Sequence, residues 1–350
     1  MQAKRRERSN RAVSIALGGV TAVAVGMMGI VGSVQRAPLG PERALGGDPV
    51  AVPLRPSSGG TQAAMRGGGA GWTTGLSSGA AAREAYRRAT GERTVPPGLV
   101  VVFHAPGLDP AEIHEALRES GAERTWCESA PRGLWTKAGP LAVEDDPLAL
   151  VVAELSSISV GLGGASAREG DDAAHVAHMA YLRALEDLSE TDASSGALVL
   201  FRTNAEDVEA VRAELQRAAG RDARVIGERV PRDSQLSVDG RAVEGGTAVL
   251  LFDGGRSPGC VQETGGAFAR GLRGTRGRVG DPAAAVLVLA EGTEPVFPSL
   301  QDVPWIAKVQ EDASGSSLGL LLPSVRGRQA QGEGPGWSES WDSAWESGAR

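Results

Sequence analysis

The sequence predicts an α+β protein: an N-terminal transmembrane helix and a disordered tether, then two ferredoxin-like domains built from βαβ units, and a disordered C-terminal tail. Three observations predict this class. An uncharged apolar run lies near the start of the 350-residue chain, and a stretch rich in Gly, Pro, Ala and Arg follows it. The rest contains short apolar runs, each followed by a helical pattern of apolar residues.

The N-terminal run predicts a membrane anchor. Residues 1–11 are basic, and residues 12–34 contain no charged side chain. At about 1.5 Å per residue, a helix over this range spans roughly 35 Å, which is enough to cross a hydrocarbon core of about 30 Å. The basic flank should stay in the cytoplasm, so the C-terminal domains are expected to be extracytoplasmic. A cleaved signal peptide, which has a shorter apolar region, is the alternative.

The next segment, residues 35–95, has few large apolar residues and many small or polar ones. Burial in such a segment cannot offset the entropy lost on ordering. We therefore predict a flexible linker here, with a short helix around residues 81–88 as an alternative for that part. Residues 326–350 have a similar composition and are predicted to form a disordered tail.

Three short apolar runs, each ending in phenylalanine, predict buried strands. They lie at 98–103, 196–201 and 246–252. A helix pattern follows each run, and second strands are predicted at 123–128, 223–228 and 284–290. These βαβ units are grouped into a first α+β domain at 96–194 and a second at 195–325.

Two shorter signals complete the predicted fold. Asp239-Gly240 is a strong hairpin signal within residues 237–243. Apolar runs at 305–309 and 318–322 predict a terminal hairpin that turns at Gly315. The glycines around Gly161 to Gly164 are interpreted as the end of a helix and a turn.

Composition excludes several classes of protein. A formal net charge of −7 argues against nucleic acid as a partner. With two cysteines, the chain cannot build a disulfide-rich scaffold or a four-thiolate zinc site. The GxSxG match at 255–259 lacks a backbone N–H after Ser257, because Pro258 follows, so we do not interpret it as a hydrolase nucleophile. No catalytic site and no bound cofactor are evident from the sequence.

One helix offers a candidate metal site. Asp171, His175 and His178 fall at spacings of four and three residues, which places them on one helix face. A carboxylate and two imidazoles can hold a divalent ion, although at least one further ligand must come from elsewhere. Solvated side chains near a helix start are the alternative.

Cys127 and Cys260 form a candidate disulfide. In an extracytoplasmic compartment an even pair of cysteines can be bridged. Two unrelated thiols, with Cys127 buried in its strand, are the alternative that the sequence leaves open.

The tail carries Trp337, Trp341 and Trp345 at four-residue spacing. On a helix this spacing gives one ridge of indoles, and tryptophan is enriched at binding hot spots. We expect these residues to bind a protein partner, with the membrane surface, which tryptophan favours, and simple disorder as the alternatives.

Taken together, these patterns predict a single-pass, membrane-anchored extracytoplasmic interaction or scaffold protein of a bacterial envelope complex. The membrane is its first partner, through residues 12–34, and a protein bound by the tail is the second. Two alternatives stay open: an envelope enzyme with a metal site on the 171–178 helix, and a structural subunit of a membrane-spanning assembly. The oligomeric state is not predicted.

Overall fold

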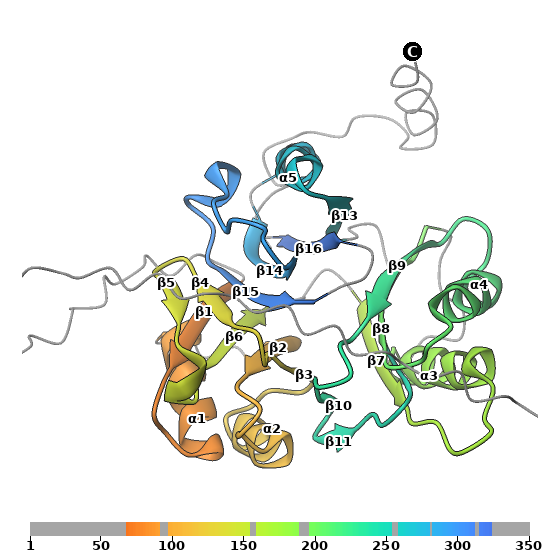
Figure 1. Ribbon diagram of the computed structural model, residues 1–350, viewed down its shortest axis with the longest axis horizontal. Coiled ribbons are helices and arrows are strands. Elements are labelled where there is room, and N and C mark those ends of the chain that lie inside the picture. Colours follow the sequence, from red (N-terminus) through yellow and green to blue (C-terminus); the bar gives the residue numbers. More distant parts are fainter. Residues whose placement is uncertain are drawn as a thin grey trace, which may run out of the picture. The chain divides into compact units, whose positions relative to one another are not determined.

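Three mixed β-sheets form the core of the protein in the computed structural model (Figure 1). The structure describes residues 68–91, 97–154, 159–188, 196–253, 258–280, 282–311 and 315–323. The predicted anchor at 12–34 and the tail at 326–350 lie outside these residues.

Each sheet belongs to one of three modules with the same order of elements. The first module, residues 68–153, contains β1 (Gly68–Thr73), α1 (Ser78–Thr90), β2 (Leu99–His104), α2 (Pro110–Glu119), β3 (Thr125–Ser129) and β6 (Leu148–Ala153). Its strands are arranged β1-β6-β2-β3, with β2 and β3 parallel and the other pairs antiparallel.

The other two modules repeat this arrangement. The second, residues 159–253, contains β7 (Ser159–Ala165), α3 (Ala173–Asp187), β8 (Leu198–Thr203), α4 (Val208–Ala219), β9 (Arg224–Arg229) and β12 (Thr247–Asp253). The third, residues 259–323, contains β13 (Gly259–Thr264), α5 (Gly266–Val279), β14 (Pro282–Ala290), the 3-10 helix η2 (Pro298–Leu300), β15 (Trp305–Gln310) and β16 (Ser316–Pro323). The orders β7-β12-β8-β9 and β13-β16-β14-β15 match that of the first module.

Two hairpins link neighbouring modules. β4 (Leu134–Thr136) and β5 (Gly139–Leu141) extend the sheet of the third module. The 3-10 helix η1 (Val143–Asp145) follows β5 and precedes β6. β10 (Leu236–Val238) and β11 (Arg241–Ala242) extend the sheet of the first module, which confirms the hairpin predicted at Asp239-Gly240. Both hairpins follow the third strand of their own module and pair with the third strand of another.

The third module has no room for such a hairpin, because only residues 311–315 separate β15 from β16. At the outer edge of β9, side chains form hydrogen bonds with the backbone instead. Arg212 Nη2 and Gln262 Nε2 both donate to the Gly227 carbonyl oxygen, at 2.9 and 3.4 Å. Side chains thus satisfy an edge carbonyl that a strand would otherwise reach.

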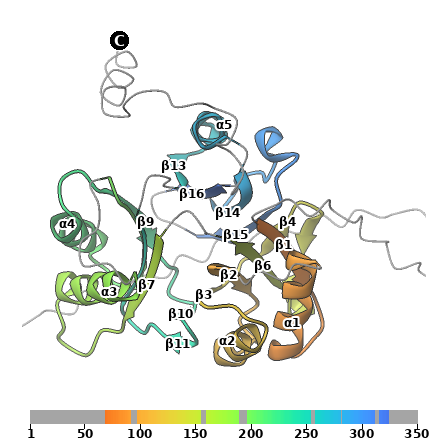
Figure 2. The ribbon, with the colours of Figure 1, turned by 180° about the vertical axis from the view of Figure 1, so that it is seen from behind.

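The helices cover one face of each sheet and leave the other face for a shared core (Figure 2). Val101, Leu200 and Val286, one from each second strand, belong to a single buried cluster that includes residues of all three sheets. The alternation of strand side chains explains this division, because odd and even positions face opposite sides.

Glycines allow the first helix of a module to approach its first strand. A Cβ on Gly69 or Gly71 would lie 2.1 or 2.0 Å from a backbone oxygen of α1. On Gly161 or Gly163 it would lie 1.8 or 2.1 Å from a backbone oxygen of α3. These strands are therefore glycine-rich because a helix backbone packs directly on them.

This packing corrects two sequence predictions. The predicted linker at 35–95 contains β1 and α1, and the predicted turn around Gly161 is strand β7. Low apolar content suggested disorder in the first case and a helix end in the second. In both, the missing side-chain volume is filled by a neighbouring helix.

The prediction of two ferredoxin-like domains is also wrong. The chain forms three modules, and the predicted strand at 246–252 closes the second module by pairing with β8, instead of opening a βαβ unit with 284–290. The predicted terminal hairpin is not formed, since β15 pairs with β14 and β4 while β16 lies between β13 and β14. Local patterns located these strands, but pairing between distant strands set the fold.

Within the residues that the structure describes, no helix combines the length and apolar character needed to cross a membrane.

Candidate functional site

The modules place charged side chains at equivalent points of their inner faces. Two residues after Val101, Leu200 and Val286, the second strands carry Phe103, Arg202 and Val288. Across each parallel pair, these three lie beside Glu128, Glu228 and Lys308 of the third strands. The same position of the repeated fold therefore holds two carboxylates and one amine.

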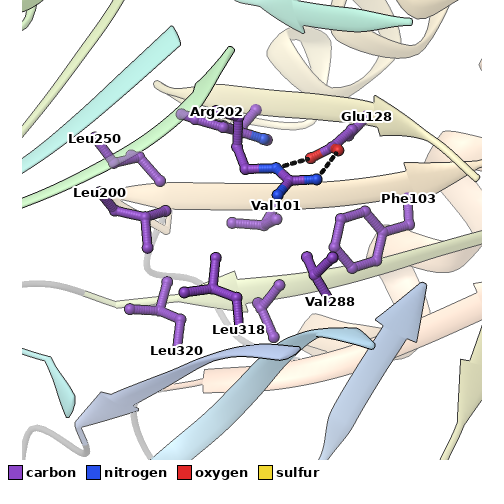
Figure 3. A pocket seen from close by; sticks show the side chains of 11 residues that line it. Val101, Phe103, Glu128, Leu200, Arg202, Leu250, Val288, Leu318 and Leu320 are labelled. Atoms are coloured by element: carbon purple, nitrogen blue, oxygen red, sulfur yellow. Dashed lines mark hydrogen bonds and ion pairs between the residues drawn. The ribbon is translucent and has the colours of Figure 1, made fainter. Parts of the chain in front are cut away.

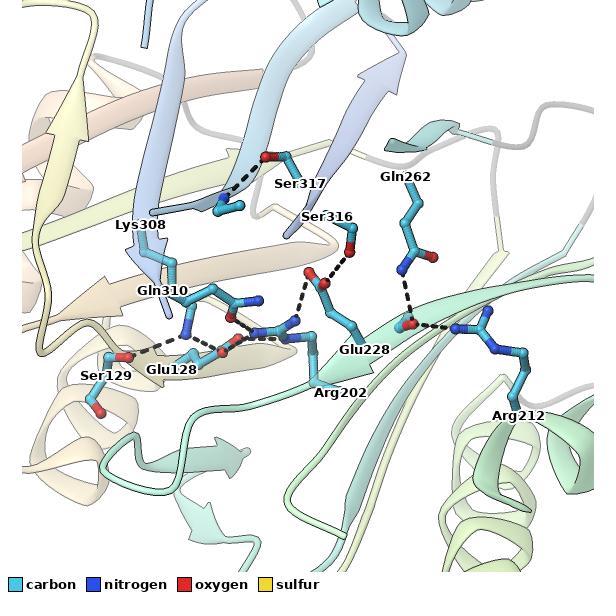
Figure 4. A network of polar contacts seen from close by, with 12 residues as sticks. Glu128, Ser129, Arg202, Arg212, Glu228, Gln262, Lys308, Gln310, Ser316 and Ser317 are labelled. Atoms are coloured by element: carbon cyan, nitrogen blue, oxygen red, sulfur yellow. Dashed lines mark hydrogen bonds and ion pairs between the residues drawn. The ribbon is translucent and has the colours of Figure 1, made fainter. Parts of the chain in front are cut away.

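Arg202 occupies the middle of the resulting network (Figure 4). Its Nη2 lies 2.8 Å from Glu128 Oε1, and its Nη1 lies 3.0 Å from Glu228 Oε1. Lys308 Nζ contacts the same Glu128 oxygen, which joins the third module to the other two. The network thus connects all three sheets.

Neutral groups complete the network. Gln310 accepts a hydrogen bond from Arg202 Nη2, and Ser316 Oγ donates to Glu228 Oε2 at 3.0 Å. Lys308 Nζ also donates to the Ser129 carbonyl oxygen at 3.4 Å. Most of the donors and acceptors of the charged groups are therefore used within the protein, as burial requires.

The network is shielded from solvent, which strengthens its electrostatics. Glu128 and Arg202 are 1% exposed and Lys308 is 0% exposed. Burial alone would raise the pKa of Glu128, but the charges of Arg202 and Lys308 outweigh it and hold that pKa at about 2. Burial lowers the pKa of Lys308 to about 8, with Glu128 opposing the shift. At neutral pH the predominant state has Glu128 ionised and Lys308 protonated.

A cavity of about 30 Å³ lies against this network (Figure 3). Each module contributes to its lining, with Arg202 and Glu128 on one side and apolar side chains such as Val288, Leu318 and Leu320 on the other. A volume of this size accommodates water-sized molecules, and polar partners are required to hold them. The cavity therefore combines two charged groups, Arg202 and Glu128, with an apolar wall.

The candidate metal ligands are not brought together as a metal site. His178 Nδ1 lies 2.8 Å from Glu214 Oε1 of α4, while His175 is exposed and Asp171 Oδ2 accepts from the Arg168 backbone N–H at 2.9 Å. Across the part of the chain that the structure describes, no three His, Cys, Asp or Glu side chains are placed to hold a metal ion. His178 instead connects α3 to α4.

Cys127 and Cys260 are free, buried thiols in the structure. Cys127 lies among residues of the helix-covered face of the first module, whereas Cys260 belongs to the shared core. Burial raises the pKa of each thiol to about 12, so neither is a ready nucleophile.

Two further sequence features lie outside the described residues. Trp337, Trp341 and Trp345 lie beyond the described residues, and so does Ser257 of the GxSxG match.

Sequence reasoning missed the network, although a signal was present. Glu128, Arg202 and Lys308 each interrupt or end an apolar strand, and Lys308 is one of only three lysines in the chain. A charged residue in such a strand is rarely buried without a partner. The signal located unusual positions but could not show that they meet.

No protein-family model and no curated protein matches the chain. Among solved structures, a cyanuric acid hydrolase described as an innovation by structural concatenation aligns with 74% of this chain and 100% of its own, at 8% identity and a TM-score of 0.39. A cyanuric acid hydrolase from A. caulinodans aligns with 73% of this chain and 99% of its own, at 9% identity and a TM-score of 0.40.

These findings correct the predicted function and location. The described residues contain no helix that could span a membrane, and the prediction of a membrane-anchored extracytoplasmic scaffold is not carried further. It depended on residues 12–34, which lie outside the described part of the chain.

Proposed function

We propose that the protein binds a small polar molecule at the junction of its three modules. The observation that supports this proposal is the convergence of Glu128, Arg202, Glu228 and Lys308, from all three modules, in one buried network whose members Glu128 and Arg202 line a cavity.

The cost of burial favours a functional role for these charges. Replacing a buried ion network by apolar residues of similar volume is often neutral or stabilising, by about 1–4 kcal/mol. Apolar side chains at the junction could therefore hold the three modules together as well as this charged network does. A strongly shifted pKa in a residue that lines a cavity, as at Glu128, is typical of a functional site.

The charges define the chemistry of the ligand. Two cations and two carboxylates leave the network with no net charge, so it gives no overall preference to an anion or a cation. A neutral molecule with both donors and acceptors, such as a small amide, matches the groups that line the junction. The cavity of about 30 Å³ restricts the ligand to a few heavy atoms unless the lining side chains move.

Lys308 also gives the site acid–base chemistry. A pKa of about 8 means that both protonation states of Lys308 are populated near neutral pH, and its amine contacts Glu128, which lines the cavity. Glu128 contacts the same amine and would stabilise its protonated form.

Formamide, formate and ammonium are suitable probes, because they differ in charge at similar small size. A ligand of three heavy atoms is limited to about −4.5 kcal/mol, so the dissociation constant of formamide should be no lower than roughly 0.5 mM. Titration to about 50 mM, followed by the NMR signal of the Arg202 Nε–H group, should show saturable binding of formamide. Formate and ammonium should bind at least several-fold more weakly.

Variants separate binding from stability. Glu128→Gln/Lys308→Met removes one positive and one negative charge and should abolish the formamide shift while the protein stays folded. Lys137→Met is the matched control, since Lys137 is exposed and should not affect binding. Absence of any saturable shift in the unmodified protein, or an unchanged shift in the double variant, would refute the proposal.

A further inference from the structure

The outward face of α5 presents unpaired positive charge. Arg270, Arg273 and Arg278 are exposed, and none forms an ion pair with another described residue. Arg276 differs, because its guanidinium lies 2.5 Å from Asp302 Oδ2. The helix therefore carries three cationic side chains that are available to an anionic partner.

Two glycines on the same face leave space for large side chains. A Cβ added to Gly274 or Gly277 would meet nothing within 4 Å among the described residues. Gly271 differs, because its Cβ would lie 2.7 Å from Val261 Cγ1. Glycine within a helix reduces its stability, and packing inside the described fold accounts for Gly271 alone.

The chain itself contains a segment of complementary chemistry. Residues 333–349 include four acidic side chains and no basic one. Trp337, Trp341 and Trp345 alternate with acidic Glu339, Asp342 and Glu346 along this segment. Indole rings stack favourably with guanidinium groups, and the carboxylates can pair with them.

The tail leaves the fold beside α5. β16 ends at Pro323, which pairs with Pro282, and Pro282 follows closely after the last residue of α5, Val279. Residues 324–336 can span at most about 43 Å, and a helix of the length of α5 is about 21 Å long. Every position on α5 is therefore within reach, and so short a tether gives an effective concentration in the millimolar range.

We propose that residues 333–349 dock onto the outward face of α5 in the same chain. The tryptophans lie over Gly274 and Gly277, and the carboxylates pair with Arg270, Arg273 and Arg278. The outward face of α5 lies outside the junction of the modules, so docking of the tail does not depend on the ligand proposed at that junction.

Site-directed photo-crosslinking of the full chain tests the docking. Ser343→Cys supplies a thiol for a benzophenone label, while Cys127 and Cys260 are buried and should not react. On illumination we expect a product with the mass of one chain, in which mass spectrometry places the crosslink within 266–279. The yield should fall at least five-fold between low salt and about 1 M salt, because exposed charges are screened.

Charge variants supply the decisive comparison. Arg270→Glu/Arg273→Glu should reduce the crosslink at least five-fold, and adding Glu339→Arg/Glu346→Arg should restore it. Arg241→Glu is the matched control, because Arg241 is exposed on β11, away from α5. Gly277→Gln should reduce the yield by filling the space for an indole, with the fold checked by circular dichroism.

Three outcomes would overturn the proposal. Crosslinks to elements other than α5 would place the tail elsewhere. A yield unchanged by Arg270→Glu/Arg273→Glu would show that charge pairing does not hold it. Products with the mass of two chains would show that the tail binds a second copy.

Discussion

Glu128 and Lys308 occupy the same position of the repeated fold, in the third strands of two different modules, and their oppositely charged side chains contact each other. Because the modules repeat one fold, the two equivalent positions lie close together in the shared core. Because the modules differ in sequence, one position carries a carboxylate and the other an amine. Arg202 of the remaining module binds the same carboxylate, so each module supplies one group to this contact.

Loss of Arg202 should leave a carboxylate without its cation. We expect Arg202→Met to lower the free energy of unfolding by about 3–5 kcal/mol, because Glu228 would remain charged and buried. Arg202→Met/Glu228→Gln should recover at least half of that loss. Urea unfolding measures both, and Arg217→Met on the exposed face of α4, where ion pairs contribute about 0–1 kcal/mol, is the control. Purely additive losses in the double variant would contradict the assignment.

The stability difference between the protein and Lys308→Met should depend on pH. The folded pKa of Lys308, about 8, lies below its ordinary value of 10.5, so the buried charge costs stability below pH 8. That cost is relieved as pH rises from 8 to 10.5, because the folded state then loses the proton first. Between pH 8 and 10.5, the free energy of unfolding of the protein with Lys308 should therefore rise by up to about 3 kcal/mol relative to that of Lys308→Met. A flat difference across this range would mean that Lys308 titrates normally.

The two cysteines should be unreactive in the folded protein. Burial and a raised pKa of about 12 disfavour the thiolate at both Cys127 and Cys260. Iodoacetamide at pH 8 should therefore modify neither thiol under native conditions and both in denaturant. Intact mass without reductant should show two thiols, and a mass lower by two hydrogens would indicate the disulfide.

Gly163→Ala should destabilise the second module strongly. The new Cβ would lie 2.1 Å from the Ala180 carbonyl oxygen, so α3 must shift away from β7. We expect a loss of more than about 3 kcal/mol, at the upper end of the values for strained backbone or overpacked sites. Gly274→Ala is the comparison: its Cβ meets open space, and helix propensity predicts a gain of about 1 kcal/mol. Equal effects of the two substitutions in thermal unfolding would contradict the close packing.

Local signals in the sequence determined many of the elements. The apolar runs ending in Phe103, Phe201 and Phe252 are strands β2, β8 and β12. The helix that carries His175 and His178 and the hairpin at Asp239 also occur as predicted. These features depend on alternation, capping and turn chemistry within a few residues, which the sequence displays directly.

Tertiary structure decided the rest, because it depends on contacts between distant residues. Gly69 and Gly163 resemble linker or turn residues until a helix is packed on them, and the pairing of β16 with β14 cannot be inferred from either strand alone. The candidate site is the clearest case. Glu128, Arg202 and Lys308 are separated by 74 and 106 positions, and they become one network only when three sheets turn their inner faces to a shared core that excludes water.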